Sequence, residues 1–131
     1  MFIPAHELVL AAKATVSEIP PAEAAAWLAG SAATSALVLD VREADEFAQG
    51  HLPGAINIPR GLLEFRISND TGLQDVARPI LLYCKTSGRA ALSAVALQAM
   101  GFTAVRSVAG GFDAWAAAGL PVARPEAISF E

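Results

Sequence analysis

Two apolar runs without polar alternation most constrain the fold of this chain. Residues 36–41 read Ala-Leu-Val-Leu-Asp-Val, and residues 80–83 read Ile-Leu-Leu-Tyr. A strand with water on one face alternates apolar and polar residues, whereas a strand covered on both faces is apolar nearly throughout. Both runs are therefore predicted to be central strands of a parallel sheet with helices on each face.

Other strand and helix candidates alternate along the chain. Strands are also expected at 14–19, 55–58 and 103–108, and helices at 5–13, 22–29, 42–47, 61–68 and 89–100. A last helix is expected between the turn at Gly110 and Gly111 and its end at Gly119. This alternation favours an α/β fold with a mainly parallel, five-stranded sheet flanked by helices. The helix at 5–13 is expected to dock outside the main fold.

Composition limits the class of protein. A length of 131 residues predicts one domain, and 54% hydrophobic with 17% charged residues excludes a disordered chain. The net charge of −4 argues against nucleic-acid binding, because no basic excess exists to neutralise phosphates. An anion site in this protein must therefore be a local cationic pocket.

The cysteine count and the N-terminus suggest a compartment. One cysteine excludes an internal disulfide framework and suits a reducing environment. The N-terminus lacks a basic region followed by a long apolar core, so we expect no signal peptide. No apolar run approaches the about 20 residues that a membrane helix needs. A cytoplasmic protein with no membrane contact is predicted.

The cysteine itself, Cys84, directly follows the second apolar run. A polar loop, 85–88, comes next, and Arg89 opens an alanine-rich helical stretch. Unpaired N–H groups of such a loop and of a first helical turn suit an anion and favour a thiolate. A buried structural cysteine is the alternative. The flanking Lys85 and Arg89 and the loop glycine favour a reactive thiol.

Asp40 and Arg42 end the first apolar run as Cys84 ends the second. Ligands of parallel α/β sheets bind beyond the carboxyl ends of the strands, so Arg42 is expected on the same rim as Cys84. Asp40 lies in a buried setting and must be hydrogen-bonded, which favours a structural role. No His or carboxylate cluster has metal-ligand spacing, so neither a metal nor a cofactor is expected.

The chain resembles a single-domain rhodanese, a sulfurtransferase domain. The resemblance rests on residues 39–47 (LDVREADEF), 50–59 (GHLPGAINIP), 83–89 (YCKTSGR), 108–115 (VAGGFDAW) and 119–122 (GLPV). It implies a three-layer fold and covers about 15–122. On this division 1–131 is one rhodanese-like domain, with 1–14 a helical extension and 123–131 a C-terminal tail.

One loop position departs from the family's pattern. The common loop places glycine fourth, counting cysteine as first, whereas here Ser87 is fourth and Gly88 fifth. If the fourth position needs a glycine-like backbone angle, Ser87 must adopt it under strain.

The resemblance implies a double-displacement sulfur transfer. Cys84 as thiolate attacks the outer sulfur of a small anionic donor such as thiosulfate, and its persulfide passes sulfur to a thiophilic acceptor. The acceptor is cyanide in an assay or a thiol in a cell, and a sulfur-relay protein is a further candidate partner. The residues implied to hold the persulfide or substrate are Lys85, Thr86, Ser87, Gly88 and Arg89, with Asp40 and Arg42 supporting.

Several roles have two interpretations. Lys85 holds the donor's sulfonate or is an exposed loop charge. Arg89 points into the cup or ties the loop to Asp40 or Glu46. Thr86 and Ser87 donate hydroxyl bonds to sulfur or only shape the turn. Among other residues, His51 is expected to fix a turn, and the aromatic residues Trp27, Phe47, Phe112 and Trp115 are expected in the core.

Two rival functions remain open. Phosphatases and arsenate reductases of the same fold separate Cys and Arg by five residues. Here four residues separate Cys84 from Arg89, which predicts a smaller cup suited to one sulfur. The second rival is a persulfide carrier or protein-interaction module. The presence of Cys84 argues against an inert module but leaves a carrier open.

Overall fold

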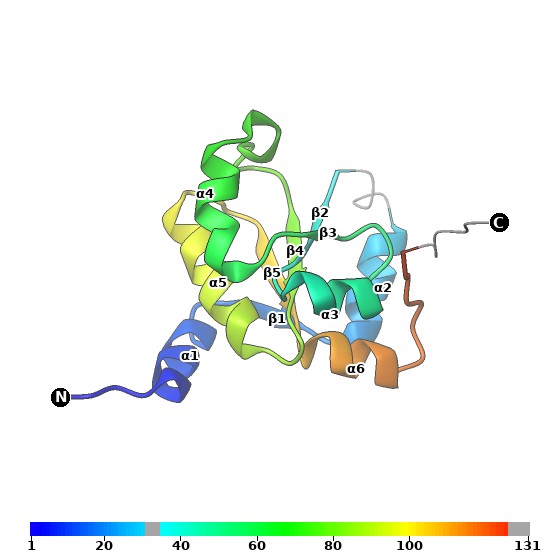
Figure 1. Ribbon diagram of the computed structural model, residues 1–131, viewed down its shortest axis with the longest axis horizontal. Coiled ribbons are helices and arrows are strands. Elements are labelled where there is room, and N and C mark those ends of the chain that lie inside the picture. Colours follow the sequence, from blue (N-terminus) through cyan, green and yellow to red (C-terminus); the bar gives the residue numbers. More distant parts are fainter. Residues whose placement is uncertain (31–34, 126–131) are drawn as a thin grey trace.

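A computed structural model describes residues 1–30 and 35–125 of the chain. Its strands form one sheet in the order β1-β5-β4-β2-β3, and every neighbouring pair is parallel (Figure 1). The strands are β1 (Ser17–Ile19), β2 (Leu37–Asp40), β3 (Ile56–Asn57), β4 (Ile80–Tyr83) and β5 (Val105–Val108). The predicted α/β fold with a five-stranded parallel sheet is therefore confirmed, and the two apolar runs, β2 and β4, lie side by side in it.

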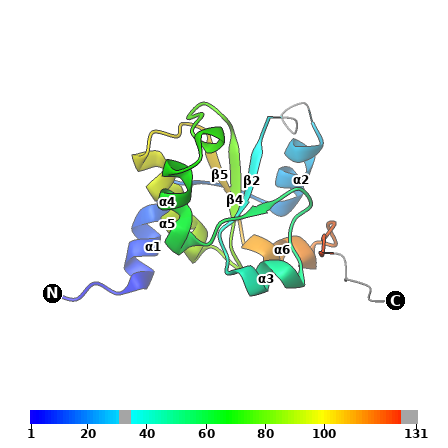
Figure 2. The same cartoon turned by 45° about the horizontal axis from the view of Figure 1, so that its top comes forward.

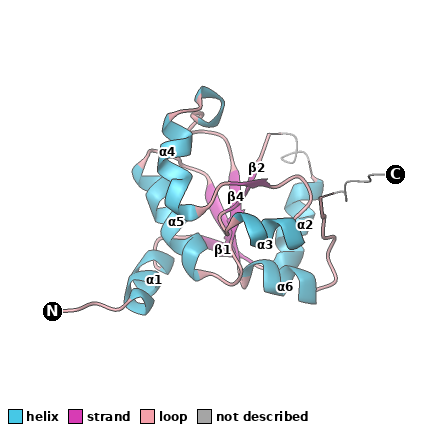
Figure 3. Ribbon diagram, viewed as in Figure 1, coloured by secondary structure: helices cyan, strands magenta, loops and turns pink. Residues whose placement is uncertain are grey.

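Helices cover both faces of the sheet (Figures 2 and 3). The α1, α4 and α5 helices lie on one side, and α2, α3 and α6 on the other. The helices are α1 (Ala5–Lys13), α2 (Pro21–Ala29), α3 (Ala44–Gln49), α4 (Leu63–Ser68), α5 (Gly88–Ala99) and α6 (Gly111–Ala117). This is the expected three-layer arrangement, and α1 is the expected additional N-terminal helix.

β4 shows why an unbroken apolar run is needed at the centre of the sheet. Leu82 and Cys84 belong to the core on the α5 side, whereas Leu81 and Tyr83 belong to the core that includes Trp115 of α6. All four residues are at most 1% exposed. Each buried leucine side chain contributes about 2 kcal/mol relative to an exposed one, so both faces of β4 stabilise its position.

The helix that follows β2 begins two residues later than the sequence predicts. Arg42 stays outside α3, because its backbone N–H and its side chain both donate to the carboxylate of Asp40. Glu43 instead precedes the helix, and its N–H donates to Glu46 Oε1 at 3.1 Å, as in a capping box. Arg42 is thereby held at the carboxyl end of β2.

α1 packs beside α5 near the site. Gln98 Nε2 of α5 donates to the carbonyl of Thr15 just after α1, at 3.1 Å. At the other end of the contact, a Cβ added to Gly88 would lie 3.5 Å from the Val9 side chain. The additional helix therefore touches the loop that follows Cys84.

The start of the expected C-terminal tail is fixed to the domain. Ala123 and His51 exchange two backbone hydrogen bonds of 2.8 and 2.9 Å as an isolated antiparallel bridge. Arg124 Nε donates to the carbonyl of Gln49 at 3.0 Å. The expected C-terminal tail therefore begins with two residues that are hydrogen-bonded to the domain, and 126–131 lie outside the described residues.

The aromatic residues are not equally buried. Trp115 is core at 3% exposure, and Trp27 and Phe112 pack partly buried against the same cluster. Phe47 stacks on the His51 ring, with centroids 3.8 Å apart, and is partly exposed. The prediction that Phe47 is a core residue is therefore wrong, because it covers the turn rather than the sheet.

Candidate active site

Cys84 lies at the carboxyl end of β4, on the face of the sheet that α5 covers. It is 1% exposed, and its Sγ accepts the N–H of Ala90 at 3.3 Å. Ala90 belongs to the first turn of α5, where N–H groups have no intrahelical acceptor. The helix thus directs a backbone donor at the sulfur.

The loop after Cys84 carries a run of unused backbone donors. The N–H groups of residues 85–89 donate to no acceptor in the described part of the chain. The hydroxyls of Thr86 and Ser87 likewise form no hydrogen bond there. Consecutive free N–H groups beside a helix start are suited to an anion.

Ser87 adopts the loop conformation without the expected strain. Its φ is −154°, and no non-glycine residue in the described ranges has a positive φ. Gly88 is already the first residue of α5. The turn therefore does not use the left-handed region at its fourth position, and the expectation of strain there is wrong.

Arg89 is turned toward α3. Its Nη1 and Nη2 donate to the two carboxylate oxygens of Glu46 at 2.7 and 3.0 Å, a bidentate pair between α5 and α3. These bonds lower the pKa of Glu46 to about 2, and the same contact raises the pKa of Arg89. Of the two interpretations of Arg89, the structure shows the ion pair.

Lys85 is an exposed residue whose Nζ binds Asp113 of α6 at 2.8 Å. Two backbone bonds join the same elements: Phe112 N–H donates to the Cys84 carbonyl at 2.8 Å, and Asp113 N–H donates to the Lys85 carbonyl at 3.0 Å. The first turn of α6 therefore holds the base of the loop through its carbonyls, which leaves the loop N–H groups free.

Gly111 makes this contact possible. Its φ is +60°, and a Cβ there would lie 2.5 Å from the carbonyl oxygens of both Cys84 and Thr86. Such distances are not tolerated between real atoms. A residue without a side chain is required where α6 meets the loop.

Asp40 and Arg42 form a buried pair at the end of β2, with exposures of 0% and 4%. Arg42 donates to Asp40 through Nε and Nη2, the shortest bond being 2.7 Å, and through Nη2 to the Gly50 carbonyl at 2.6 Å. Its guanidinium also lies 4.4 Å from the centre of the Phe112 ring. Burial lowers the pKa of Arg42, but the bond and charge of Asp40 outweigh burial and raise it. Asp40 is thus occupied in holding Arg42.

A cavity of about 260 Å³ adjoins the loop. Its wall is formed by the end of α3, the start of α6, the loop and the C-terminal segment. The lining residues are Arg42, Glu46, Gln49, Gly50, Lys85, Phe112, Asp113 and Arg124.

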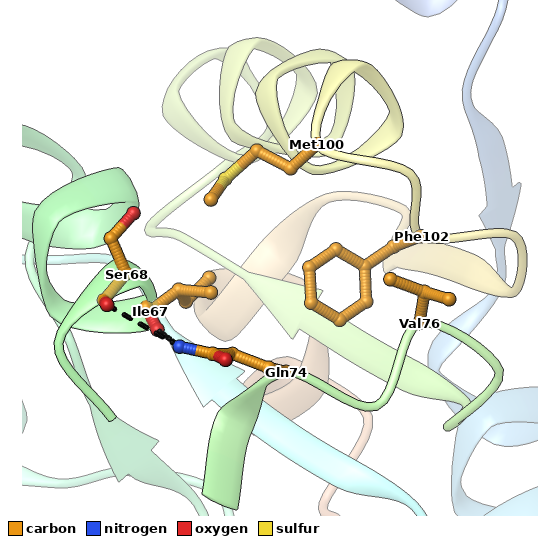
Figure 4. Close-up of a pocket in the computed structure, with 6 residues that line it drawn as sticks. All are labelled: Ile67, Ser68, Gln74, Val76, Met100 and Phe102. Atoms are coloured by element: carbon orange, nitrogen blue, oxygen red, sulfur yellow. Dashed lines mark hydrogen bonds between the residues drawn. The ribbon is translucent and has the colours of Figure 1, made fainter. Parts of the chain in front are cut away.

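A second cavity, of about 310 Å³, is lined by residues that include Ile67, Met100 and Phe102 (Figure 4). Val76 and Phe102 line it and precede β4 and β5, so it opens at the amino ends of these strands. Its Gln74 amide already donates to the Ile67 and Ser68 carbonyls at 2.9 and 3.3 Å. Distance from Cys84 and the satisfied amide separate this cavity from the candidate site.

Within residues 1–30 and 35–125, no three or more His, Cys, Asp or Glu side chains gather as metal ligands would. The same ranges contain no helix of the length and apolar character needed to span a bilayer.

The fold and the site define a class: a parallel, three-layer α/β domain with one cysteine beside a loop of unpaired backbone N–H groups, at the carboxyl ends of the strands. The family model for the rhodanese-like domain matches residues 21–118. The chain therefore belongs to the rhodanese-like family.

The relatives it resembles include sulfurtransferases. Thiosulfate sulfurtransferase 16, chloroplastic, of Arabidopsis thaliana is 40% identical over 95 residues, 63% of this chain and 76% of that protein. A sulfurtransferase of Allochromatium vinosum is 34% identical over 90 residues, 69% of this chain and 80% of that protein.

Solved structures agree on the fold. A protein of unknown function from Rhodopseudomonas palustris, described as a possible tyrosine phosphatase, has a TM-score of 0.85 at 29% identity, covering 94% of this chain and 96% of that one. The polysulfide-sulfur transferase homodimer of Wolinella succinogenes has a TM-score of 0.74 at 33% identity, covering 91% and 86%.

Sequence reasoning did not assign several residues that shape the site. Phe112 and Asp113 contact the loop from α6, and Asp113 lies 28 positions after its partner Lys85 in the chain. The sequence identifies Gly111 only as a turn residue. The sequence does contain a signal for this contact: two glycines directly precede a helix whose first turn carries an acidic residue.

Proposed function

We propose that this protein is a thiosulfate sulfurtransferase-type enzyme that carries sulfane sulfur on Cys84. The observation that carries the proposal is the buried thiol followed by five unpaired backbone N–H groups, with the Ala90 N–H on Sγ. Such donors stabilise negative charge on sulfur as an oxyanion hole does on oxygen.

The first half-reaction loads the enzyme. The Cys84 thiolate attacks the outer sulfur of thiosulfate, a bond forms between Sγ and that sulfur, and the bond to the sulfonate sulfur breaks with its electron pair. Sulfite leaves, and Cys84 becomes a persulfide whose terminal sulfur is anionic. The free N–H groups of residues 85–89 would hold that sulfur.

The second half-reaction unloads it. A thiophilic acceptor, cyanide in an assay or a thiol in a cell, attacks the terminal sulfur, and Cys84 leaves as the thiolate. Cys84 is almost fully buried, and the S–S bond of the persulfide would place the transferred atom about 2 Å beyond Sγ. We further propose a small anionic donor, a thiol acceptor or sulfur-relay protein, and a cytoplasmic setting.

A phosphatase would need its arginine at the substrate. Here the Arg89 guanidinium is occupied by both oxygens of Glu46, and only four residues separate it from Cys84. Both observations support sulfur rather than a tetrahedral phosphate as the group that the loop binds.

Intact-protein mass spectrometry tests the proposal directly. Incubation with thiosulfate should add one sulfur atom to the wild type and none to Cys84→Ser, and thiosulfate with cyanide should yield thiocyanate only with the wild type. A wild type that gains no sulfur from thiosulfate, mercaptopyruvate or a protein persulfide would refute it. Sulfur uptake without thiocyanate would instead indicate a carrier, and hydrolysis of an aryl phosphate would indicate a phosphatase.

A further inference from the structure

The cavity beside the loop has a lining suited to an organic anion. We call it the Arg42–Arg124 cavity, lined by the eight residues given above. Lys85 follows Cys84 in the chain, and Phe112 donates its N–H to the Cys84 carbonyl at 2.8 Å. The cavity therefore lies beside the backbone of Cys84, although the cysteine itself is not one of its lining residues.

Arg42 offers an unused donor to this cavity. Its Nε and Nη2 are bound to Asp40 and Gly50, but its Nη1 has no hydrogen-bond partner among the described residues. Among the described residues, Ser93 Oγ is the one fully buried side-chain nitrogen or oxygen without a hydrogen-bond partner. Arg42 Nη1 also lacks a partner, so it is not fully buried and must reach solvent. Arg42 is 96% buried and lines the cavity, so Nη1 meets solvent there.

Arg124 adds a charge that has no acidic partner among residues 1–30 and 35–125. It is exposed, and its Nε donates to the Gln49 carbonyl, whereas Lys85 is paired with Asp113 and Arg42 with Asp40. Three lining residues are cationic and two are acidic, which leaves one positive charge. The acid Glu46 is itself balanced by Arg89, which lies outside the lining. This is a local cationic pocket in a protein of net charge −4.

The volume indicates the size of the ligand. About 260 Å³ is near the lower end of small-molecule pockets and exceeds the need of thiosulfate or cyanide. The Phe112 ring supplies an apolar wall. A compound of amino-acid size with one carboxylate and a short apolar stem matches this lining.

We propose that the Arg42–Arg124 cavity binds the carboxylate of a cysteine-type thiol that accepts sulfur from Cys84. This inference rests on the proposed sulfur transfer and names its acceptor class. The acceptor thiolate attacks the terminal sulfur of the Cys84 persulfide, a new S–S bond forms on the acceptor, and the bond to Cys84 Sγ breaks to regenerate its thiolate. No external oxidant or reductant is consumed.

Binding can be tested without any turnover. The unreactive probe N-acetyl-S-methylcysteine is titrated into ¹⁵N-labelled protein, with its neutral carboxamide as the matched ligand. The carboxylate should shift the amide signals of Gly50, Phe112 and Arg124 at several-fold lower concentration than the amide does. Equal shifts from both probes, or shifts only elsewhere, would overturn the proposal.

Kinetics supply the second readout. N-acetylcysteine and its carboxamide are compared as acceptors in wild type, Arg124→Gln and the control Arg66→Gln, whose exposed side chain lies on α4. The ratio of kcat/KM for the acid to kcat/KM for the amide should fall about threefold in Arg124→Gln, because an exposed charge pair contributes about that factor to binding. The ratio should stay unchanged in the Arg66→Gln control. An unchanged ratio in Arg124→Gln would contradict the proposal.

The two proposals can fail separately. If neither thiosulfate, mercaptopyruvate nor a protein persulfide loads sulfur onto Cys84, the sulfur-transfer proposal fails, and the titration still tests the carboxylate site. If sulfur is loaded but neither the titration nor the kinetic ratio depends on the carboxylate, only the acceptor class is wrong.

Discussion

Replacing Gly111 by alanine tests how α6 supports the Cys84 loop. The added Cβ would lie 2.5 Å from the carbonyl oxygens of Cys84 and Thr86 and 2.8 Å from the Lys85 carbonyl carbon. All three atoms belong to backbone, so no side chain can rotate to relieve the contact. Either the loop or the first turn of α6 must move.

The cost has two parts. The left-handed conformation at φ +60° costs a non-glycine residue about 1–2 kcal/mol. Displacing packed backbone adds about 1–3 kcal/mol, as in overpacked cores. We therefore expect Gly111→Ala to lower the free energy of unfolding by about 2–5 kcal/mol.

Gly119→Ala is the matched control, because Gly119 has φ +73° but no atom within 4 Å of an added Cβ. It should cost only the conformational part, about 1–2 kcal/mol. Urea unfolding measures both variants, and intact mass after thiosulfate treatment measures sulfur loading. We expect Gly111→Ala to load sulfur much more slowly than Gly119→Ala, since the shifted carbonyls carry the loop N–H groups with them.

Equal destabilisation by the two substitutions would refute this reasoning, because it would show that the close approach of α6 to the loop carries no energy. Normal sulfur loading in a destabilised Gly111→Ala protein would refute the link from α6 to the loop N–H groups, while leaving the packing argument intact.

Three further predictions concern single contacts measured by urea unfolding. Glu46→Gln should lower stability by about 1 kcal/mol at neutral pH. The pKa of Glu46 is about 2 in the folded protein, compared with 4.5 for an unperturbed glutamate. The stability difference between wild type and Glu46→Gln should therefore shrink as pH falls from about 4.5 toward 2. A difference that stays constant over this range would contradict the prediction. Ser93→Ala should be neutral or stabilising by up to about 1 kcal/mol, because its buried hydroxyl has no partner among the described residues, and a clear loss would argue against this. Tyr83→Phe should cost about 1–2 kcal/mol, because the buried Leu52 N–H loses its acceptor at 3.0 Å, whereas unchanged stability would show that the N–H finds another.

The sheet was predictable because burial on two faces leaves a direct mark on sequence. β2 and β4 lack alternation, and both lie inside the sheet between other strands. Helix starts were less predictable, since they depend on side-chain contacts. α3 begins after Arg42 because the Arg42 side chain binds Asp40, and helical periodicity does not predict that contact.

The candidate site was predictable where it is local and not where it is assembled. Cys84 and the following loop could be found from a strand end, a polar turn and a helix start. The sequence leaves both Asp40 and Glu46 open as partners of Arg89. The structure shows that the partner is Glu46, which lies 43 positions earlier in the chain. Arg124 had no local pattern, because its place depends on the backbone bridge between Ala123 and His51.

The paired charges explain what the loop can offer to sulfur. Lys85 and Arg89 flank Cys84 in sequence, but each is bound to an acid, Asp113 or Glu46, so each contributes a neutral pair rather than a free cation. The donors that remain beside the thiol are backbone N–H groups, whose dipoles no counter-ion cancels and no pH change removes. Such donors fit a small, polarisable sulfur anion, and a full positive charge strengthens the hydrogen bonds to a carboxylate. In this chain that charge lies in the neighbouring cavity at Arg124, and Arg42, which is paired with Asp40, adds its free Nη1 donor there.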